Sequence, residues 1–254
     1  MCGILGILAH HDVAQDLFDG LILLQHRGQD SAGIMTYNHR FHLKKGNGLV
    51  REVFHTKNMI RLQGPMGIGH VRYPTAGSYD AAEAQPFYVN SPFGIGLIHN
   101  GNLTTYEELK NQLMKGNIRH LNTNSDSEVL LNIVADELLN LKKSKLKPED
   151  IFHAMEKVFR RIKGSYSVIM MIAEYGLVAF RDPNGIRPLI FGKRENGNIP
   201  PEFIFASESV SIEGLGFKID SDVQPGEAIF IDMKRNVYRK QIAKTNWAPC
   251  IFEH

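Results

Sequence analysis

The second residue of the chain is a cysteine, and this position can give it two reactive groups on one α-carbon. When Met1 is removed, Cys2 becomes the first residue and carries a thiol beside a free α-amine. The amine titrates near ~8 and the thiol near ~8.5, so the amine can accept the thiol proton close to neutral pH. One residue would then supply a nucleophile and its general base. Position alone is equally consistent with a small apolar residue leading into a buried strand.

Four further segments combine glycines with polar side chains that strand formation does not require. They are L-Q-H-R-G-Q-D-S-A-G (24–33), G-H-V-R-Y-P-T-A-G (69–77), H-N-G-N-L (99–103) and N-S-D-S-E (124–128). Taken singly, each has a simple structural explanation. Asn100-Gly101 is typical of a hairpin turn, and Asp126 suits the first turn of a helix.

Together with Cys2, these segments supply what the hydrolysis of a side-chain amide requires. A thiolate that attacks an amide carbonyl creates an oxyanion, which the side-chain amide of Asn100 and the backbone N–H of Gly101 could stabilise. Arg72 could bind the α-carboxylate of a free amino acid, and Asp126 could pair with its α-ammonium group. The sequence therefore predicts hydrolysis of the side-chain amide of glutamine.

Short strands and a few amphipathic helices must position these residues. Apolar runs predict strands over 3–9, 32–37, 40–45, 67–73, 93–100, 166–173, 176–181, 188–193, 203–206 and 226–232. Apolar residues at helical spacing predict helices over 13–25, 49–62, 126–141 and 148–163. Ser125 and Glu128 match a capping box at the start of the third helix. Two central helices flanked by runs of strands indicate one α+β domain with antiparallel sheets.

Composition excludes several classes of protein. The 254 residues carry a net charge of +2 and no basic run, so we expect no nucleic-acid partner. The longest apolar stretches, such as 166–173, are too short to span a membrane, and the N-terminus lacks a signal-peptide pattern. Cys2 and Cys250 cannot form a disulfide framework or a C-x-x-C site. We therefore expect no metal site, no membrane partner and a reducing cytoplasmic environment.

In their order along the chain, these motifs resemble those of the class II glutamine amidotransferases, which are N-terminal-nucleophile (Ntn) hydrolases. The opening M-C-G-I-L-G-I belongs to the same pattern. L-Q-H-R-G-Q-D-S-A-G and H-V-R-Y-P-T are most similar to the amidophosphoribosyltransferase branch, whereas the hexosamine branch typically has Y-R-G-Y-D-S-A-G. Three more segments resemble the same branch: R-D-P-N-G-I-R-P-L (181–189), A-S-E-S (206–209) and P-C-I-F-E-H (249–254).

The resemblance implies a fold and a set of site residues. The fold would be a four-layer αββα sandwich of two antiparallel sheets. The implied catalytic residues are Cys2 as nucleophile, with its α-amine as general base, and Asn100 and Gly101 as the oxyanion hole. The implied substrate-binding residues are Arg72 and Asp126, with Arg27, Tyr73 and Thr75 expected to line or support the same pocket.

The resemblance also implies that the chain is part of a longer enzyme. We expect a glutamine amidotransferase domain over 1–247 and the start of a connection to a phosphoribosyltransferase domain over 248–254. The phosphate-loop motif of that second domain is not found here. The chain would hydrolyse glutamine without a cofactor. The full-length enzyme would use the ammonia, with Mg²⁺ and phosphoribosyl pyrophosphate (PRPP), to make 5-phosphoribosylamine in the first step of de novo purine synthesis. We expect that enzyme to be a homo-oligomer.

Two other interpretations remain open. The glutaminase domain could serve another acceptor, as in hexosamine or asparagine synthesis. Alternatively, the chain could be a catalytically silent binding domain in which Met1 is retained and blocks Cys2.

Overall fold

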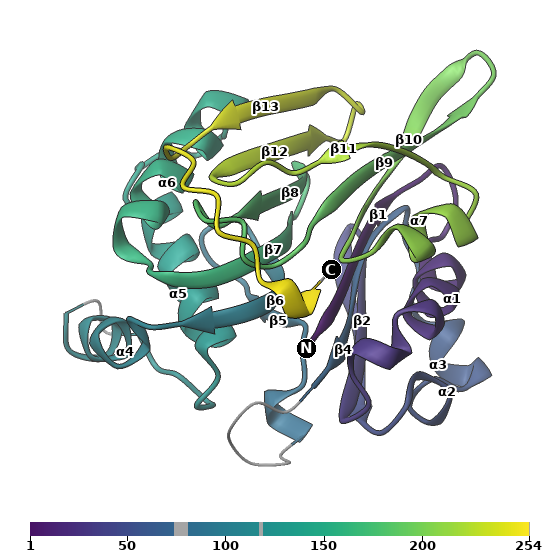
Figure 1. Ribbon diagram of the computed structural model, residues 1–254, viewed down its shortest axis with the longest axis horizontal. Coiled ribbons are helices and arrows are strands. Elements are labelled where there is room, and N and C mark those ends of the chain that lie inside the picture. The colour runs from purple at the N-terminus through teal and green to yellow at the C-terminus, as the bar shows by residue number, and fades with distance from the viewer. Residues whose placement is uncertain (74–80, 117–118, 254) are drawn as a thin grey trace.

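Two antiparallel β-sheets pack face to face between two layers of helices in the computed structural model (Figure 1). The structure describes residues 1–73, 81–116 and 119–253. The four layers form the αββα sandwich expected from the sequence. No helix in the described ranges is both long enough and apolar enough to cross a membrane.

The first sheet has seven strands and contains the N-terminal strand near its centre. Its strand order is β11-β9-β10-β1-β4-β2-β3. The bounds are β1 (Gly3–Leu8), β2 (Ser31–Asn38), β3 (Arg40–Asn47), β4 (Met66–Arg72), β9 (Ile190–Asn196), β10 (Ile199–Ala206) and β11 (Lys218–Asp222). Its outer face is covered by α1 (Ala14–Leu23), α2 (Val50–Val53), α3 (Thr56–Met59) and α7 (Ser209–Gly214).

The second sheet has six strands in the order β13-β12-β8-β7-β6-β5. The bounds are β5 (Phe87–Val89), β6 (Ile95–Leu103), β7 (Gly164–Ile172), β8 (Gly176–Arg181), β12 (Glu227–Asp232) and β13 (Val237–Gln241). The helices on its outer side are α4 (Tyr106–Lys115), α5 (Asp126–Leu139) and α6 (Pro148–Arg161). The described residues also form the short 3₁₀ turns η1 (Gln25–Arg27), η2 (Ala81–Glu83) and η3 (Ile251–Glu253).

Strand β1 shows why its sequence is apolar throughout. Ile4 and Leu8 join the core between the two sheets. Leu5 and Ile7 join the core beneath α1. Because successive side chains of a strand point to opposite faces, a strand buried on both sides needs apolar residues at every position. By the same alternation, Cys2 lies on the face of Ile4, toward the second sheet.

The two central helices are confirmed, although one capping contact differs from the prediction. The Ser125 side chain accepts the N–H of Ser127, 3.3 Å away, as an N-cap residue does. Glu128 does not complete a capping box on Ser125. Its carboxylate accepts the backbone N–H groups of Asn122 and Thr123, at 2.9 and 2.7 Å, and so holds the loop before α5.

The single helix predicted over 49–62 is wrong. The structure has two four-residue helices there, α2 and α3, separated by Phe54 and His55 in extended conformations. This break lets Phe54, which is 4% exposed, pack edge-on against Phe18 of α1 with ring centroids 6.4 Å apart. The free energy gained by burying the Phe54 ring thus exceeds the free energy lost by ending a short helix.

Candidate active site

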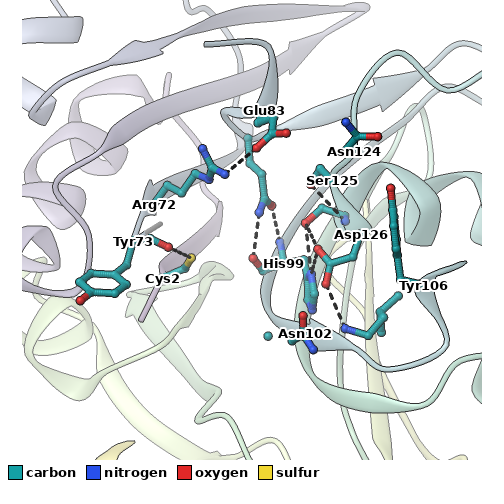
Figure 2. Close-up of a pocket in the computed structure, with 14 residues that line it drawn as sticks. Cys2, Arg72, Tyr73, Glu83, His99, Asn102, Tyr106, Asn124, Ser125 and Asp126 are labelled. Atoms are coloured by element: carbon teal, nitrogen blue, oxygen red, sulfur yellow. Dashed lines mark hydrogen bonds and ion pairs between the residues drawn. The ribbon is translucent and has the colours of Figure 1, made fainter. Parts of the chain in front are cut away.

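A pocket of about 280 Å³ lies where β1 begins and β4 ends in the first sheet (Figure 2). Its other wall comes from β6 of the second sheet and the start of α5. Cys2, Arg72 and Tyr73 form one wall, and His99, Asn102 and Asp126 form the opposite wall. Pockets for drug-sized ligands are typically ~300–1,000 Å³, so this pocket suits a ligand the size of an amino acid. Of the eight residues predicted for the site, five line it: Cys2, Arg72, Tyr73, Gly101 and Asp126.

The thiol of Cys2 lies at the bottom of the first wall and needs a base. Its Sγ lies 3.9 Å from the backbone carbonyl oxygen of Tyr73. Burial raises the pKa of the Cys2 thiol, although the Tyr73 carbonyl contact and the positive charge of Arg72 act in the opposite direction. The N-terminal amine, which is on Met1 in this structure, has its pKa lowered mainly by burial. A neutral thiol therefore lies next to an amine that loses its proton more readily than an exposed one.

Asn100 and Gly101 lie inside strand β6, so the hairpin-turn interpretation of this pair is wrong. Asn100 is opposite Ser167 of β7, and Gly101 is opposite Tyr166. Glycine is needed here for a different reason. A Cβ on residue 101 would lie 2.0 Å from the carbonyl oxygen of Ser165 and 2.7 Å from Nε2 of His99. Close approach of the neighbouring strand, and not turn geometry, explains this glycine.

The side chain of Asn100 carries an unused hydrogen-bond donor. The residue is 2% exposed, and its Nδ2 has no hydrogen-bond partner in the part of the chain that the structure describes. Along β6, Asn100 follows Ile98, which belongs to the core between the sheets, by two positions. Asn100 and Cys2 therefore both lie on the inner faces of their sheets, although Asn100 itself is not among the residues that line the pocket. A buried unpaired donor costs ~1–3 kcal/mol, which a ligand oxygen could offset.

Arg72 ends β4 and is held by two carboxylates that sequence reasoning missed as partners. Nη1 lies 3.2 Å from Oδ2 of Asp30, and Nη2 lies 2.7 Å from Oε2 of Glu83. Asp30 comes from the L-Q-H-R-G-Q-D-S-A-G segment, which now has a role in orienting the guanidinium. Glu83 lies in η2 and belongs to no motif, so the sequence carried no signal for it.

Asp126 begins α5 and is fixed from several sides. Its Oδ2 accepts the backbone N–H of Leu103 at 3.0 Å, and its Oδ1 lies 3.7 Å from Nδ1 of His99. Burial alone would raise the pKa of Asp126, but His99 and the hydrogen bonds from Leu103 and Ser127 lower it overall. The group is thus a carboxylate at neutral pH, as binding of an ammonium group requires.

Arg27, Tyr73 and Thr75, the residues expected to line or support the pocket, have different positions. Arg27 does not line the pocket: it is buried behind Cys2, and its Nε donates to the Cys2 carbonyl oxygen at 2.9 Å. Tyr73 lines the pocket, but its side chain is 54% exposed and its carbonyl is the group that faces the thiol. Thr75 lies outside the described residues.

Two glycines of the 24–33 segment allow the chain to pack directly against the pocket walls. A Cβ on Gly28 would lie 2.5 Å from the carbonyl carbon of Arg72. A Cβ on Gly33 would lie 1.9 Å from the carbonyl oxygen of Gln85. The side-chain amide of Gln85 in turn binds both main-chain groups of His99. Its oxygen accepts the His99 N–H at 2.7 Å, and its nitrogen donates to the His99 carbonyl at 3.1 Å. Gly28 thus packs against the end of β4, and Gly33 of β2 packs against Gln85, which is bonded to β6.

A buried histidine beside the pocket predicts how stability depends on pH. His70 of β4 is fully buried, and this burial lowers its pKa from 6.5 to about 3. The unfolded chain therefore binds one more proton than the folded chain between these two values. His70 alone should therefore lower the free energy of unfolding as the pH falls from 6.5 toward 3, by on the order of 1 kcal/mol per pH unit.

Urea unfolding of the parent and of His70→Gln from pH 7 to pH 4 measures this effect. The free energy of unfolding of the parent should fall more steeply with decreasing pH than that of His70→Gln. Any stability advantage of the parent at pH 7 should therefore shrink or reverse by pH 4. A difference that stays constant with pH would contradict the assignment.

Across 1–73, 81–116 and 119–253, no group of three or more His, Cys, Asp or Glu side chains is arranged to hold a metal ion.

Comparison with known proteins agrees with this geometry. The sequence model of the glutamine amidotransferase domain matches residues 72–214. An amidophosphoribosyltransferase of Pasteurella multocida is 55% identical over 100% of this chain and 51% of that protein. The one of Pseudomonas aeruginosa is 54% identical over 100% of this chain and 51% of its own length. The chain thus spans about half the length of the curated relatives it matches.

A solved structure gives the same result. The glutamine phosphoribosylpyrophosphate amidotransferase from B. subtilis, complexed with ADP and GMP, superposes with a TM-score of 0.83 and 30% sequence identity. This match covers 98% of the present chain and 51% of that chain. Because the family model covers more than half of the sequence, and a solved structure of a similar protein has the same fold, the chain belongs to the glutamine amidotransferase domain family.

Proposed function

We propose that the chain hydrolyses the side-chain amide of glutamine to glutamate and ammonia through a γ-glutamyl thioester on Cys2. One observation carries the proposal: a single pocket is lined by the thiol-bearing Cys2, by Gly101 and by the opposite charges of Arg72 and Asp126. The buried, unpaired amide of Asn100, which precedes Gly101 in β6, supports it. Family membership supports it, because the matched domain is named for glutamine amide transfer.

The first step makes a covalent bond to the substrate. With Met1 removed, the α-amine of Cys2 takes the thiol proton, directly or through a water molecule. The sulfur attacks the γ-carbonyl carbon, and the electron pair of the C=O double bond moves onto oxygen. The Nδ2–H of Asn100 and the N–H of Gly101 stabilise that oxyanion.

The second step releases ammonia and restores the enzyme. The oxyanion collapses, the C–N bond breaks, and the ammonium form of the Cys2 amine gives its proton to the leaving nitrogen. Water then attacks the thioester carbonyl, with the amine again acting as base. Glutamate leaves, and the thiol recovers its proton.

Charge complementarity explains why a free amino acid would bind here. The Asp126 carboxylate, held ionised, pairs with the α-ammonium group. Arg72 binds the α-carboxylate, which replaces Glu83 at Nη2, where Glu83 now lies 2.7 Å away. Tyr73 and Thr75 belong to the same region of the chain, and Arg27 supports the nucleophile from behind.

We infer that this domain supplies ammonia within a longer enzyme. The similar relatives are named amidophosphoribosyltransferase and extend to about twice the aligned length, which supports PRPP as the acceptor and 5-phosphoribosylamine as the product. The amidotransferase domain would occupy 1–247 and the connection 248–254. Mg²⁺ would accompany PRPP in the second domain. We place this enzyme in the cytoplasm, as a homo-oligomer.

Covalent labelling tests the proposed function. A diazoketone analogue of glutamine should form one adduct on Cys2, located by peptide mapping, and free glutamine should protect against it. Cys250→Ser is the matched control and should label as the parent does, because Cys250 has no part in the mechanism. An adduct on Cys250, or no adduct on a chain whose mass shows Met1 removed, would overturn the proposal. A mass that shows Met1 retained, with no adduct, would favour the silent binding domain.

A further inference from the structure

The last described turn of the chain lies beside its first residues (Figure 1). In this turn, η3, the side chains of Ile251 and Phe252 are 81% and 82% exposed. Glu253 follows them directly, yet its side chain is 0% exposed. A buried carboxylate is rare unless it is paired, so its partners matter.

Glu253 is buried between two arginines. One carboxylate oxygen pairs with Nη2 of Arg27, and the other pairs with Nη1 of Arg187. The Arg27 side chain is itself only 3% exposed. A buried guanidinium is costly unless carboxylates compensate it, and the loss of one partner leaves an uncompensated charge.

Arg27 connects this carboxylate to the nucleophile. Its Nη1 pairs with Glu208 at 2.6 Å, its Nη2 pairs with Glu253, and its Nε donates to the carbonyl oxygen of Cys2 at 2.9 Å. Because a guanidinium is planar and rigid, two carboxylates on its Nη atoms fix the direction of the Nε–H. The position of the Cys2 carbonyl therefore depends on both acids.

The main chain holds Glu253 in place. Between residues 246 and 250, three backbone N–H groups donate to carbonyls of the loop at 183–186. The pairs are Asn246 to Pro183 at 2.8 Å, Ala248 to Asn184 at 2.8 Å and Cys250 to Ile186 at 3.4 Å. The final turn is therefore attached along its approach and does not depend on the Glu253 ion pairs alone.

The same charges act on the N-terminal amine. Burial is the main cause of its lowered pKa; Arg27 lowers this pKa further, whereas Glu253 raises it. This amine is that of Met1. With Met1 removed the amine is that of Cys2, whose carbonyl Arg27 binds. We expect the same charges to act on it, so removal of the Glu253 charge should let the Cys2 amine lose its proton at a lower pH. This is an effect that a purely structural contact would not have.

We propose that Glu253 is a positioning residue for the Cys2 nucleophile: acting through Arg27, it fixes the Cys2 backbone, so that the placement of the C-terminal turn controls reactivity at the N-terminus. This inference rests on the proposed function in that Cys2 is taken as the nucleophile. Glu253 does not touch the pocket, and the substrate contacts of Arg72 and Asp126 do not depend on it.

Two variants of Glu253 separate the effect of its charge from the effect of its side-chain length. Glu253→Gln keeps the shape and removes the charge. It should lower kcat for glutamine hydrolysis roughly tenfold or more, because small displacements of a nucleophile have large effects, and leave KM nearly unchanged. It should also move the acidic limb of the kcat/KM profile to lower pH. Glu253→Asp keeps the charge and shortens the side chain, so it should lower kcat without moving that limb. Should the glutamine variant fail to fold, the aspartate variant still tests the proposal.

Phe252→Ser is the matched control, since it alters an exposed side chain of the same turn and should behave as the parent. Parent-like kcat in the folded Glu253 variants would overturn the proposal. So would an equal loss of kcat in Phe252→Ser, or a Glu253→Gln profile whose acidic limb does not move.

The pH dependence of Cys2 alkylation by iodoacetamide gives an independent readout. If the parent hydrolyses no glutamine, the proposed function fails, but a shift of this alkylation profile in Glu253→Gln still supports the link to Cys2, and no shift refutes it.

Discussion

Asn100→Ala is expected to lower kcat for glutamine hydrolysis by ~10²–10³-fold, the typical effect of removing one oxyanion-hole donor. KM should change little, because the oxyanion forms only after the sulfur attacks, and the groups proposed to bind the α-carboxylate and α-ammonium are elsewhere. The fold should tolerate the change. Among the described residues Nδ2 of Asn100 has no hydrogen-bond partner, so its removal breaks no such contact.

Asn100→Asp sharpens this experiment, because aspartate keeps the shape of asparagine and lacks the Nδ2 donor. Both variants should lose turnover in steady-state measurements of ammonia release. Asn111→Ala on α4, whose amide donates to the Glu107 carbonyl at 2.9 Å, is the control for removing an asparagine far from the pocket. If Asn100→Ala retains turnover within threefold of the parent, Asn100 has no role in stabilising the oxyanion.

A chain that keeps a residue before Cys2 is expected to lose essentially all glutaminase activity. The nitrogen of Cys2 is then an amide, whose lone pair is delocalised and cannot take a proton. The nearest amine belongs to the preceding residue and lies one peptide unit away. General-base catalysis typically contributes ~10²–10⁴-fold, and without it the buried thiol stays protonated because burial raises its pKa.

Two preparations measure this effect. A cleavable fusion can release the chain with Cys2 first, or with one added glycine before it, and intact mass verifies each product. Ammonia release should be seen only in the first, while iodoacetamide at high pH should alkylate Cys2 in both. Equal turnover in the two preparations would show that another group serves as base.

The sequence predicted most of the fold because periodicity reports burial directly. β1 is apolar at each position because it is buried on both faces, and α6 has one apolar stripe because it covers one sheet. Elements with little buried surface were missed. Helix α4 buries only Leu109 and Leu113, and edge strand β13 is mostly exposed, so neither leaves a clear pattern.

Local chemistry misled where long-range pairing decides the structure. An Asn-Gly pair favours a turn by itself, but Asn100 and Gly101 are held extended by β7, which lies more than sixty residues later in the chain. The partners of the site residues show the same limit. Glu83 and Gln85 belong to no motif, and only the folded chain brings them to Arg72 and His99. Arg27 was predicted from its motif to line or support the pocket, and in the structure it contacts the backbone of Cys2 and does not line the pocket.

The central place of β1 in its sheet imposes an order of events during synthesis. β1 needs β4 on one side and β10 on the other, and β10 ends only at Ala206. At ~5–20 residues per second, the ribosome needs roughly 10–40 s to reach that strand. During this time β1 has been synthesised but lacks β10, its second neighbouring strand. An aminopeptidase can then reach Met1, which is partly buried once the chain has folded. The topology thus leaves a period in which Cys2, the proposed nucleophile, can become the first residue before the sheet closes around it.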